Sequence, residues 1–373
     1  MKFVTNQEDL FLLLSYAVKF VSEKSLIKRY AQNKDFIDYL SGVSNEISDF
    51  PPAESFKLER LRDEIKKLNI NELKKRIESY EIKFISINND FYPQKLKDIP
   101  DPPVGLFYKG DVKLLDKSNS IAIVGTRNTT NYGKNIAKRV SKLLSEAGAL
   151  IVSGLAAGID TFAHEGTLEN GKTIAVLGTS LDIVFPAENK SLFEKMLKCN
   201  GLIVSEYPVY TPGLPWNFPQ RNRIISALSS AVIVVEGDIQ SGAMITAKFA
   251  IKQNKALFAV PGPVDSPVSN GPNILIKAKV AEMFTSVNDV LEILGQPKQM
   301  SIPLGKKEES FVEDLSKTQK EIYKAICNGT NSLDDFISST GLDVKDLLKD
   351  LSIMELKGII EKSSDGQYVK AGL

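Results

Sequence analysis

Six consecutive residues, 218–223, place an aromatic ring beside two guanidinium groups. They read FPQRNR: Phe218 comes first, Arg221 and Arg223 are fourth and sixth, and Asn222 lies between the arginines. Guanidinium groups bind phosphate oxygens through paired hydrogen bonds, and a flat ring can stack on a nucleobase. This spacing therefore predicts binding of a nucleotide or a nucleic-acid strand. An internal ion-pair cluster around a core phenylalanine is the alternative, and the hexapeptide alone does not separate the two.

Three further loops carry residues suited to anion binding. Each follows a short apolar run, SIAIV (120–124), ALIVS (149–153) or AVIVVE (231–236), and each leads into a helical segment. Small residues there let the backbone approach a ligand, and the first N–H groups of a helix attract anions. Plain structural turns, with Asp160 as a helix cap, are the competing interpretation. The candidates are Gly125, Thr126, Arg127, Ser153, Gly154, Ser241 and Gly242.

No catalytic apparatus is evident in the sequence. It contains no dinucleotide-binding glycine fingerprint after the first apolar run, no P-loop lysine motif and no nucleophile elbow. The only histidine is His164, for which packing within a helix is favoured over catalysis, and the only cysteines are Cys199 and Cys327. We therefore expect no enzymatic activity, no metal site, no cofactor and no disulfide framework.

The elements that must position these residues follow from the apolar pattern. Short apolar runs alternate with helical segments from about residue 83 to 295, as in the stretch 133–148 between the first two runs. Continuous apolar strands joined by helices predict a parallel sheet covered on both faces, an α/β fold of the doubly wound Rossmann type. Ligands of such sheets bind beyond the carboxyl ends of the strands, where all the candidate loops fall. Two earlier extended runs, 83–87 and 104–110, are expected to form an edge hairpin or an extra strand.

Four segments follow from changes in composition along the chain. Residues 1–82 have helical spacing and predict a small helical (SAM-like) domain, and 83–295 form the Rossmann-type domain. The polar stretch 296–312 predicts a linker. Residues 313–373 predict three helices and a strand–turn–strand, which is a winged helix. Its eight lysines and eleven acidic residues give a net charge of −3, which favours contact with protein over duplex DNA.

The overall composition limits the possible partners. The 373 residues carry a formal net charge of +1, so any nucleic-acid contact must come from basic residues gathered into one cleft. No apolar run is long enough to span a membrane, and the first residues predict a folded helix, with no signal peptide. With two cysteines, the natural compartment is the reducing cytoplasm.

Several stretches of the chain resemble the DNA-processing protein A family (DprA, also called Smf). They appear in the family's order between about residues 92 and 280. The clearest are IAIVGTRNTTNYG (121–133), IVSGLAAGIDTFAHEG (151–166), FPQRNRIISALSSAVIVVEG (218–237) and SGAMITAKFA (241–250). The helical N-terminal segment and the C-terminal winged helix match the longer members in architecture.

The resemblance implies a function as well as a fold. Such proteins bind single-stranded DNA in a positively lined pocket, form homodimers, load the RecA recombinase onto incoming strands during natural transformation, and have no established enzymatic activity. By motif, Arg127, Arg221 and Arg223 would bind phosphates and Phe218 would stack a base, while Gly125, Thr126, Ser153, Gly154, Ser241 and Gly242 would form the backbone wall. Lys190 is a weaker candidate.

One departure and one alternative remain open at this point. Near residue 271 the family favours a glycine where this chain has Lys279, so either the local turn differs or the lysine extends the basic rim. The alternative function is a Rossmann-type enzyme that binds nucleotides or cleaves nucleoside monophosphates, with Glu236 or Asp238 as its carboxylate.

Overall fold

The computed structural model describes residues 7–17, 33–45, 51–295, 315–327, 331–341, 343–356, 359–363 and 367–370. The chain divides into two compact units, 1–298 and 299–373, and each is described by itself. The linker predicted at 296–312 lies outside the described residues, as does the predicted hairpin turn at Asp365 and Gly366.

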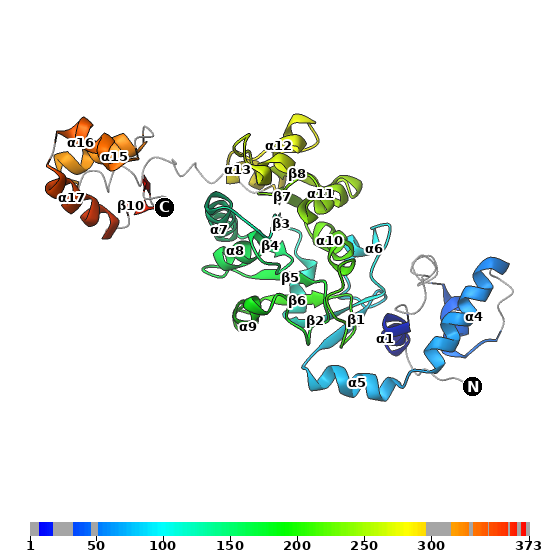
Figure 1. The fold of residues 1–373 in the computed structure, drawn as a ribbon. Coiled ribbons are helices and arrows are strands. Elements are labelled where there is room, and N and C mark those ends of the chain that lie inside the picture. The colour runs from blue at the N-terminus through cyan, green and yellow to red at the C-terminus, as the bar shows by residue number, and fades with distance from the viewer. Residues whose placement is uncertain are drawn as a thin grey trace. The chain divides into compact units, whose positions relative to one another are not determined.

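A nine-stranded sheet forms the centre of the first unit (Figure 1), in the order β1-β2-β6-β5-β4-β3-β7-β8-β9. Its strands pair in parallel except at one edge, where β1 pairs with β2, and β2 with β6, in antiparallel fashion. The predicted α/β fold with a mostly parallel sheet is confirmed, and the two early runs form an edge hairpin. The strands are β1 (Lys83–Ser86), β2 (Gly105–Gly110), β3 (Ser120–Val124), β4 (Leu150–Ser153), β5 (Thr173–Leu177), β6 (Leu202–Ser205), β7 (Ala231–Val234), β8 (Ala256–Ala259) and β9 (Glu282–Met283).

Alternate residues of the central strands face two separate hydrophobic clusters. In β3, Ile121 and Ile123 belong to one cluster, while Ala122 and Val124 belong to the other. Both faces of the sheet are therefore buried, which explains why these strands are continuously apolar.

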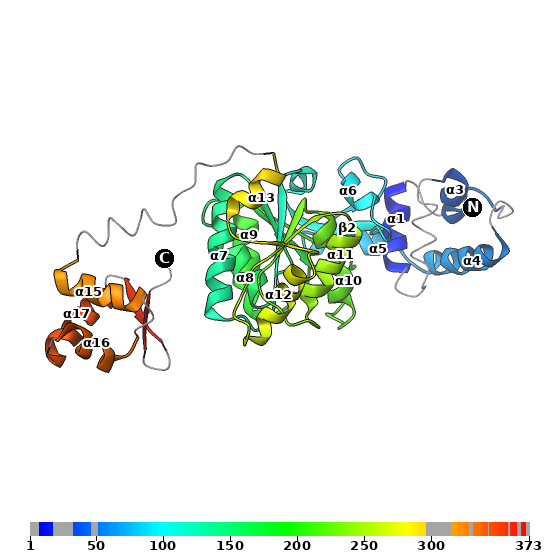
Figure 2. The same ribbon diagram turned by 90° about the horizontal axis from the view of Figure 1, so that it is seen from above.

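Helices cover both faces (Figures 1 and 2). One cluster takes in α7 (Asn131–Glu146), α8 (Ile159–Thr167) and α13 (Val287–Ile293), and the other takes in α10 (Asn217–Ala227) and α11 (Gly242–Lys252). In both views α7 and α8 lie on the opposite side of the sheet from α10 and α11. The remaining helices described between residues 83 and 295 include α6 (Gln94–Lys97), α9 (Lys190–Lys198) and α12 (Asn270–Lys277).

The N-terminal helices share a hydrophobic cluster with the antiparallel edge of the sheet. Leu10 and Phe11 of α1 belong to the same cluster as Leu106 of β2. The Glu8 carboxylate accepts hydrogen bonds from the Ser86 backbone N–H at 2.8 Å and from its hydroxyl at 2.5 Å. These helices and the sheet belong to one compact unit, and the domain boundary at residue 82 stays a prediction from the sequence. These helices are α1 (Gln7–Ala17), α3 (Lys34–Ser41), α4 (Pro52–Lys66) and α5 (Ile70–Ser79).

The described residues of the second unit form three helices followed by a strand pair, in the predicted order. They are α15 (Lys317–Cys327), α16 (Leu333–Thr340), α17 (Val344–Leu356), β10 (Ile360–Lys362) and β11 (Tyr368–Lys370), with β10 and β11 antiparallel. Phe336, Leu347 and Leu351 are fully buried in the core of this unit. Among the described residues of the whole chain, no helix has both the length and the apolar composition needed to cross a bilayer.

The order in which strands are added to the sheet reverses at β3. From β3 the chain adds β4, β5 and β6 on one side, and then returns to add β7 on the other side of β3. The loops after β3 and β7 therefore leave the same edge of the sheet toward opposite faces. Such a switch point is where doubly wound sheets open a crevice for ligands.

Candidate functional site

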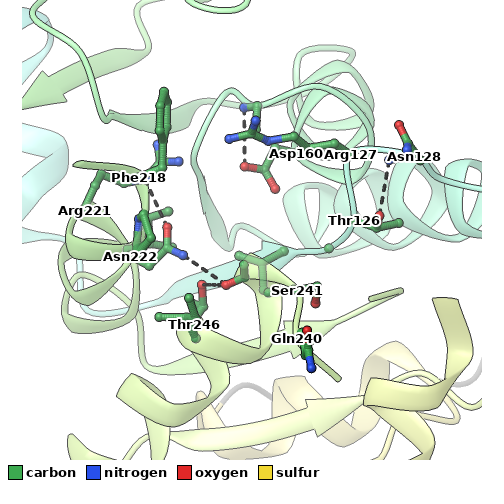
Figure 3. Close-up of a pocket in the computed structure, with 18 of the residues that line it drawn as sticks. Thr126, Arg127, Asn128, Asp160, Phe218, Arg221, Asn222, Gln240, Ser241 and Thr246 are labelled. Atoms are coloured by element: carbon green, nitrogen blue, oxygen red, sulfur yellow. Dashed lines mark hydrogen bonds between the residues drawn. The ribbon is translucent and has the colours of Figure 1, made fainter. Parts of the chain in front are cut away.

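A cleft of about 450 Å³ opens at this switch point. Residues 124–128 line it from the loop after β3, and residues between 215 and 225 line it from the start of α10. Residues between 240 and 246, at the start of α11, close the third side, and Ala156 and Asp160 complete it. Figure 3 shows these groups converging from separate elements on one hollow.

Arg127 and Phe218 form a cation–ring pair inside the cleft. The guanidinium carbon of Arg127 lies 5.1 Å from the centre of the Phe218 ring. Arg127 is exposed, and both residues also line an adjoining hollow of about 80 Å³. A charged group that binds phosphate and a flat surface that can stack on a base thus lie side by side.

Close packing fixes the orientation of the Phe218 ring. Its neighbour Phe185 lies 5.4 Å away between ring centres, at a tilt of 43°. A Cβ atom on Gly178 would lie 2.8 Å from Cδ1 of Phe218, and one on Gly213 would lie 3.0 Å from its Cζ. A side chain at Gly178 would displace the ring and one at Gly213 would press on it, so these glycines let the surrounding chain pack closely around the ring.

The backbone on either side of Arg127 is fixed by neighbouring loops. The Thr126 N–H donates to the carbonyl of Glu236 at 2.7 Å, and the Thr126 carbonyl accepts from the Ile159 N–H at 3.2 Å. Gly158 has a φ of 80°, and a Cβ atom there would collide with the carbonyl oxygens of Thr126 and Arg127. The backbone wall predicted at Gly125 and Thr126 thus lies in closely packed chain, and Arg127, which is predicted to bind phosphate, belongs to the same loop.

Among α7, α8 and α11, the start of α11 is the one that no carboxylate of the described residues occupies. The start of α7 is filled by the Glu236 carboxylate, which accepts from the Thr130 N–H at 3.0 Å. At the start of α8, the carboxylate of Asp160 in the first turn accepts from the Gly154 N–H at 3.1 Å. At α11, Ser241 makes no side-chain cap, its hydroxyl has no partner among the described residues, and Gly242 begins the helix. Gly242 and Ala243, whose amides begin α11 without a side-chain acceptor, both line the cleft.

Arg221 lines the cleft and is also hydrogen-bonded to the backbone beneath it. Its side chain is buried, and one terminal nitrogen donates to the carbonyl of Gly154 at 2.7 Å and to that of Val176. Burial lowers the pKa of Arg221 to about 10, and the nearby Asp160 carboxylate partly opposes that shift. Burial also raises the pKa of Asp160, against the attraction of Arg221. Arg221 therefore ties the loop after β4 to the sheet beneath the cleft.

Arg223 departs from its expected position. It is 3% exposed and lines neither hollow; its guanidinium pairs with Glu206 at 2.8 Å and with Asp101 at 3.2 Å. These carboxylates outweigh the effect of burial and raise the pKa of Arg223. The physical reason is helical geometry: α10 begins at Asn217, and two residues along a helix turn the side chain by about 200°.

The other residues predicted for the site differ in whether they line the cleft, the smaller hollow or neither. Asn222 lines the cleft and donates to the carbonyl of Gly242 at 3.1 Å, which joins α10 to α11. Ser153 is fully buried and donates to the carbonyl of Ile123 at 2.7 Å. Gly154 lines only the smaller hollow. Lys190 is exposed at the start of α9 and lines neither hollow.

His164 and Trp216 lie outside the cleft lining. His164 is fully buried, its Nδ1 lies 2.8 Å from the Thr173 hydroxyl, and burial lowers the pKa of the imidazole to about 3. It is therefore neutral and packed within the fold, as the sequence favours. Trp216 is 64% exposed immediately before α10. Within the described residues, no cluster of acidic, histidine or cysteine side chains could hold a metal ion.

Sequence reasoning did not anticipate every group at the site. Thr246 and Gln240 line the cleft from the α11 side, and Asn128 lines it from the loop after β3. Phe185 supports the Phe218 ring. The signal for Phe185 was its place next to Pro186 after an apolar strand, but nothing local indicates that it meets Phe218.

Comparisons with known proteins agree on one family. Residues 83–295 match the model of the family described as DNA recombination-mediator protein A. The chain is similar to DNA processing protein DprA of Bacillus subtilis, with 40% identity over 69% of this chain and 80% of that protein. It is also similar to the crystal structure of DprA from Streptococcus pneumoniae, with a TM-score of 0.63, 34% identity, and coverage of 78% of this chain and 98% of that one.

A second solved structure concerns the binding of nucleic acid. It is DNA processing protein A from Helicobacter pylori, described for its single-stranded DNA binding mode. The TM-score is 0.52 at 34% identity, and the match covers 57% of this chain and 96% of that one.

Proposed function

The chain belongs to the DNA recombination-mediator protein A family, and from that premise we propose that it binds single-stranded DNA in the cleft and delivers the strand to the RecA recombinase. The strand would be incoming DNA in natural transformation or a substrate of recombination. The protein would act in the cytoplasm as a homodimer, without enzymatic activity. A relative known for single-stranded DNA binding supports the choice of ligand.

One observation carries this proposal. The cleft brings together the exposed Arg127 guanidinium, the Phe218 ring and the open start of α11. Arg127 is suited to one phosphate, the Phe218 ring to a base, and the start of α11 to a second phosphate. A volume of about 450 Å³ suits a nucleotide of an unpaired strand. In a duplex the bases are stacked within the double helix, so they cannot reach the Phe218 ring.

The geometry also bears on the enzymatic alternative. A hydrolase on this fold would need a carboxylate free to activate water. Glu236 is 2% exposed, and its oxygens accept from Thr129 and Thr130, so it is engaged as a structural acceptor. Asp238 is exposed and accepts from the Ile239 N–H at 2.8 Å. Neither lies on the cleft lining, which favours the binding function.

For the second unit we propose a winged-helix role in protein contact. Three helices and an antiparallel strand pair follow the order of that motif. The segment 313–373 has a net charge of −3, which opposes binding to a polyanion. Val344 and Leu348 of α17 are each 42% exposed, one helical turn apart, and offer an apolar contact. RecA or a second copy of this chain would be the partner.

The ligand class is tested by fluorescence anisotropy with labelled oligo-dT and with a duplex of equal length. We expect oligo-dT to bind more tightly, and Phe218→Leu to weaken that binding about tenfold because a stacking surface is lost. Phe91→Leu is the matched control, since Phe91 is 58% exposed and lines neither hollow. Equal affinity for both ligands, or an unchanged affinity in Phe218→Leu, would contradict the proposal.

A further inference from the structure

Glu236 is a buried carboxylate that reaches from one strand to the loop of its neighbour. It follows β7 and is 2% exposed. Its Oε2 accepts from the Thr129 hydroxyl at 2.7 Å and from the Thr130 N–H at 3.0 Å, and its Oε1 accepts from the Thr130 hydroxyl. All three donors belong to the loop between β3 and α7 that carries Arg127.

The same residue also holds the other side of Arg127. Its carbonyl oxygen accepts the Thr126 N–H at 2.7 Å. Glu236 therefore contacts the chain immediately before Arg127 through its backbone, and two and three residues after it through its carboxylate. Fixing both ends of so short a segment leaves few conformations for the residue between them.

Close packing leaves no space for a different arrangement. A Cβ atom on Gly133 would collide with the Glu236 carboxylate, and one on Gly125 would lie 2.9 Å from the Glu236 carbonyl oxygen. On the opposite side of the loop, Gly158 packs against the carbonyls of Thr126 and Arg127. The loop is thus clamped between Glu236 and the turn before α8.

We propose that Glu236 is the positioning residue of the DNA site: its carboxylate fixes the loop of Arg127 so that the guanidinium stands over the Phe218 ring. The inference rests on the proposed function, because it names what prepares that cleft for a strand. Arg127 touches the strand, whereas Glu236 acts through Arg127. A binding group that is already in place loses less conformational freedom when its ligand arrives.

The direction in which DNA affinity changes when the Glu236 carboxylate is removed distinguishes positioning from simple electrostatics. Removing a negative charge beside a site for a polyanion should strengthen binding if charge alone mattered. Positioning predicts the opposite, since loss of the carboxylate frees the loop. A variant that lacks the charge and yet binds more weakly therefore reports on geometry.

The test measures oligo-dT affinity by anisotropy in Glu236→Ala and Glu236→Gln. We expect Glu236→Ala to weaken binding about fivefold, since three charge-assisted hydrogen bonds to the loop are lost. Glu236→Gln retains an acceptor and should recover part of that loss. Asp238→Asn is the control for charge, because Asp238 is exposed two residues away, and it should leave binding unchanged or slightly stronger.

A double-mutant cycle asks whether Glu236 works through Arg127. In an Arg127→Ala background, Glu236→Ala should change affinity by less than about twofold, because the group that it positions is already gone. An equal loss in both backgrounds would overturn the proposal. If Glu236→Ala does not fold, as judged by its thermal transition, Thr129→Val removes one of the three donors and should give a smaller loss in the same direction.

Hydrogen exchange gives a readout that does not depend on DNA. Backbone amides of residues 126–130 should exchange faster in Glu236→Gln than in the wild type, while those of α11 stay protected. Unchanged exchange in this loop would overturn the inference even if the wild type binds oligo-dT. Conversely, wild-type protein that fails to bind oligo-dT would refute the proposed function, and the exchange data would still decide whether Glu236 fixes the loop.

Discussion

Three arginines near the carboxyl edge of the sheet have three different environments. Arg127 is exposed and stands over a ring, Arg221 is buried against backbone carbonyls, and Arg223 is paired with two carboxylates. A guanidinium N–H that is engaged inside the protein is not available to a phosphate. We therefore propose that the phosphate contact, which the sequence analysis assigned to three arginines, falls chiefly on Arg127.

Replacement of Arg223 is predicted to damage stability and leave binding intact. Arg223→Met keeps much of the side-chain volume but removes the ion pair with Glu206, whose side chain is 10% exposed. We expect the free energy of unfolding to fall by about 3 kcal/mol, the usual result of breaking a buried pair from one side. Urea denaturation measures this, and adding Glu206→Gln should restore part of the loss.

The same variant separates the two interpretations of the hexapeptide. Because Arg223 lines neither hollow, the folded Arg223→Met protein should bind oligo-dT with an affinity within about twofold of the wild type. A stable protein with affinity lowered tenfold or more would show that Arg223 contacts the strand, as the resemblance to the family implies.

At the scale of single residues, the sequence predicts which side chains gather at one edge of the sheet but not the direction in which each one points. Phe218 and Arg127 each belong to a loop or helix start after a strand, so their meeting at one edge could be predicted from the sheet. The direction of Arg223 could not, because it depends on α10 beginning at Asn217 and on Asp101, which is far away in sequence.

At the scale of elements, the strands and helices could be predicted from the sequence, but the side chains that occupy the helix starts could not. Unbroken apolar runs identified the buried strands, and small residues identified the helix starts. Which helix start stays open depends on carboxylates from other loops: Glu236 comes from the neighbouring strand and fills α7, while α11 receives no side-chain cap. No local pattern encodes that difference.

The end of α12 shows the effect of a lysine where the family favours glycine. Lys279 has a φ of 56° and donates its N–H to the carbonyl of Ile276 at 2.9 Å. The turn is thus the left-handed one that suits glycine, so the local turn is retained and the lysine is strained within it.

Lys279→Gly is therefore predicted to stabilise the protein by about 1 kcal/mol, since relief of left-handed strain exceeds the added entropy of the unfolded chain. Thermal or urea unfolding measures the change. Asn254→Gly is the matched control: Asn254 has a φ of 53°, but asparagine tolerates that conformation, so its gain should be smaller. A loss of stability in Lys279→Gly would refute this account of the turn.

At the scale of the whole molecule, basic and acidic residues almost balance, so any attraction of DNA must come from basic groups gathered in one place. The net charge is +1, and the second unit contributes an acidic segment. The composition predicts such focusing into a cleft, and the basic residues among those that line the cleft are Arg127 and Arg221. The division into two compact units keeps the cleft entirely within residues 1–298.

The salt dependence of oligo-dT binding by wild-type protein and Arg127→Ala tests the central claim most directly. Each phosphate contact on a single strand contributes about 0.7 to the slope of log affinity against log salt. We predict that Arg127→Ala binds about tenfold more weakly and with a slope less steep by about 0.7, while Arg139→Ala, on the exposed face of α7, matches the wild type. An Arg127→Ala protein with wild-type affinity and slope would contradict the account.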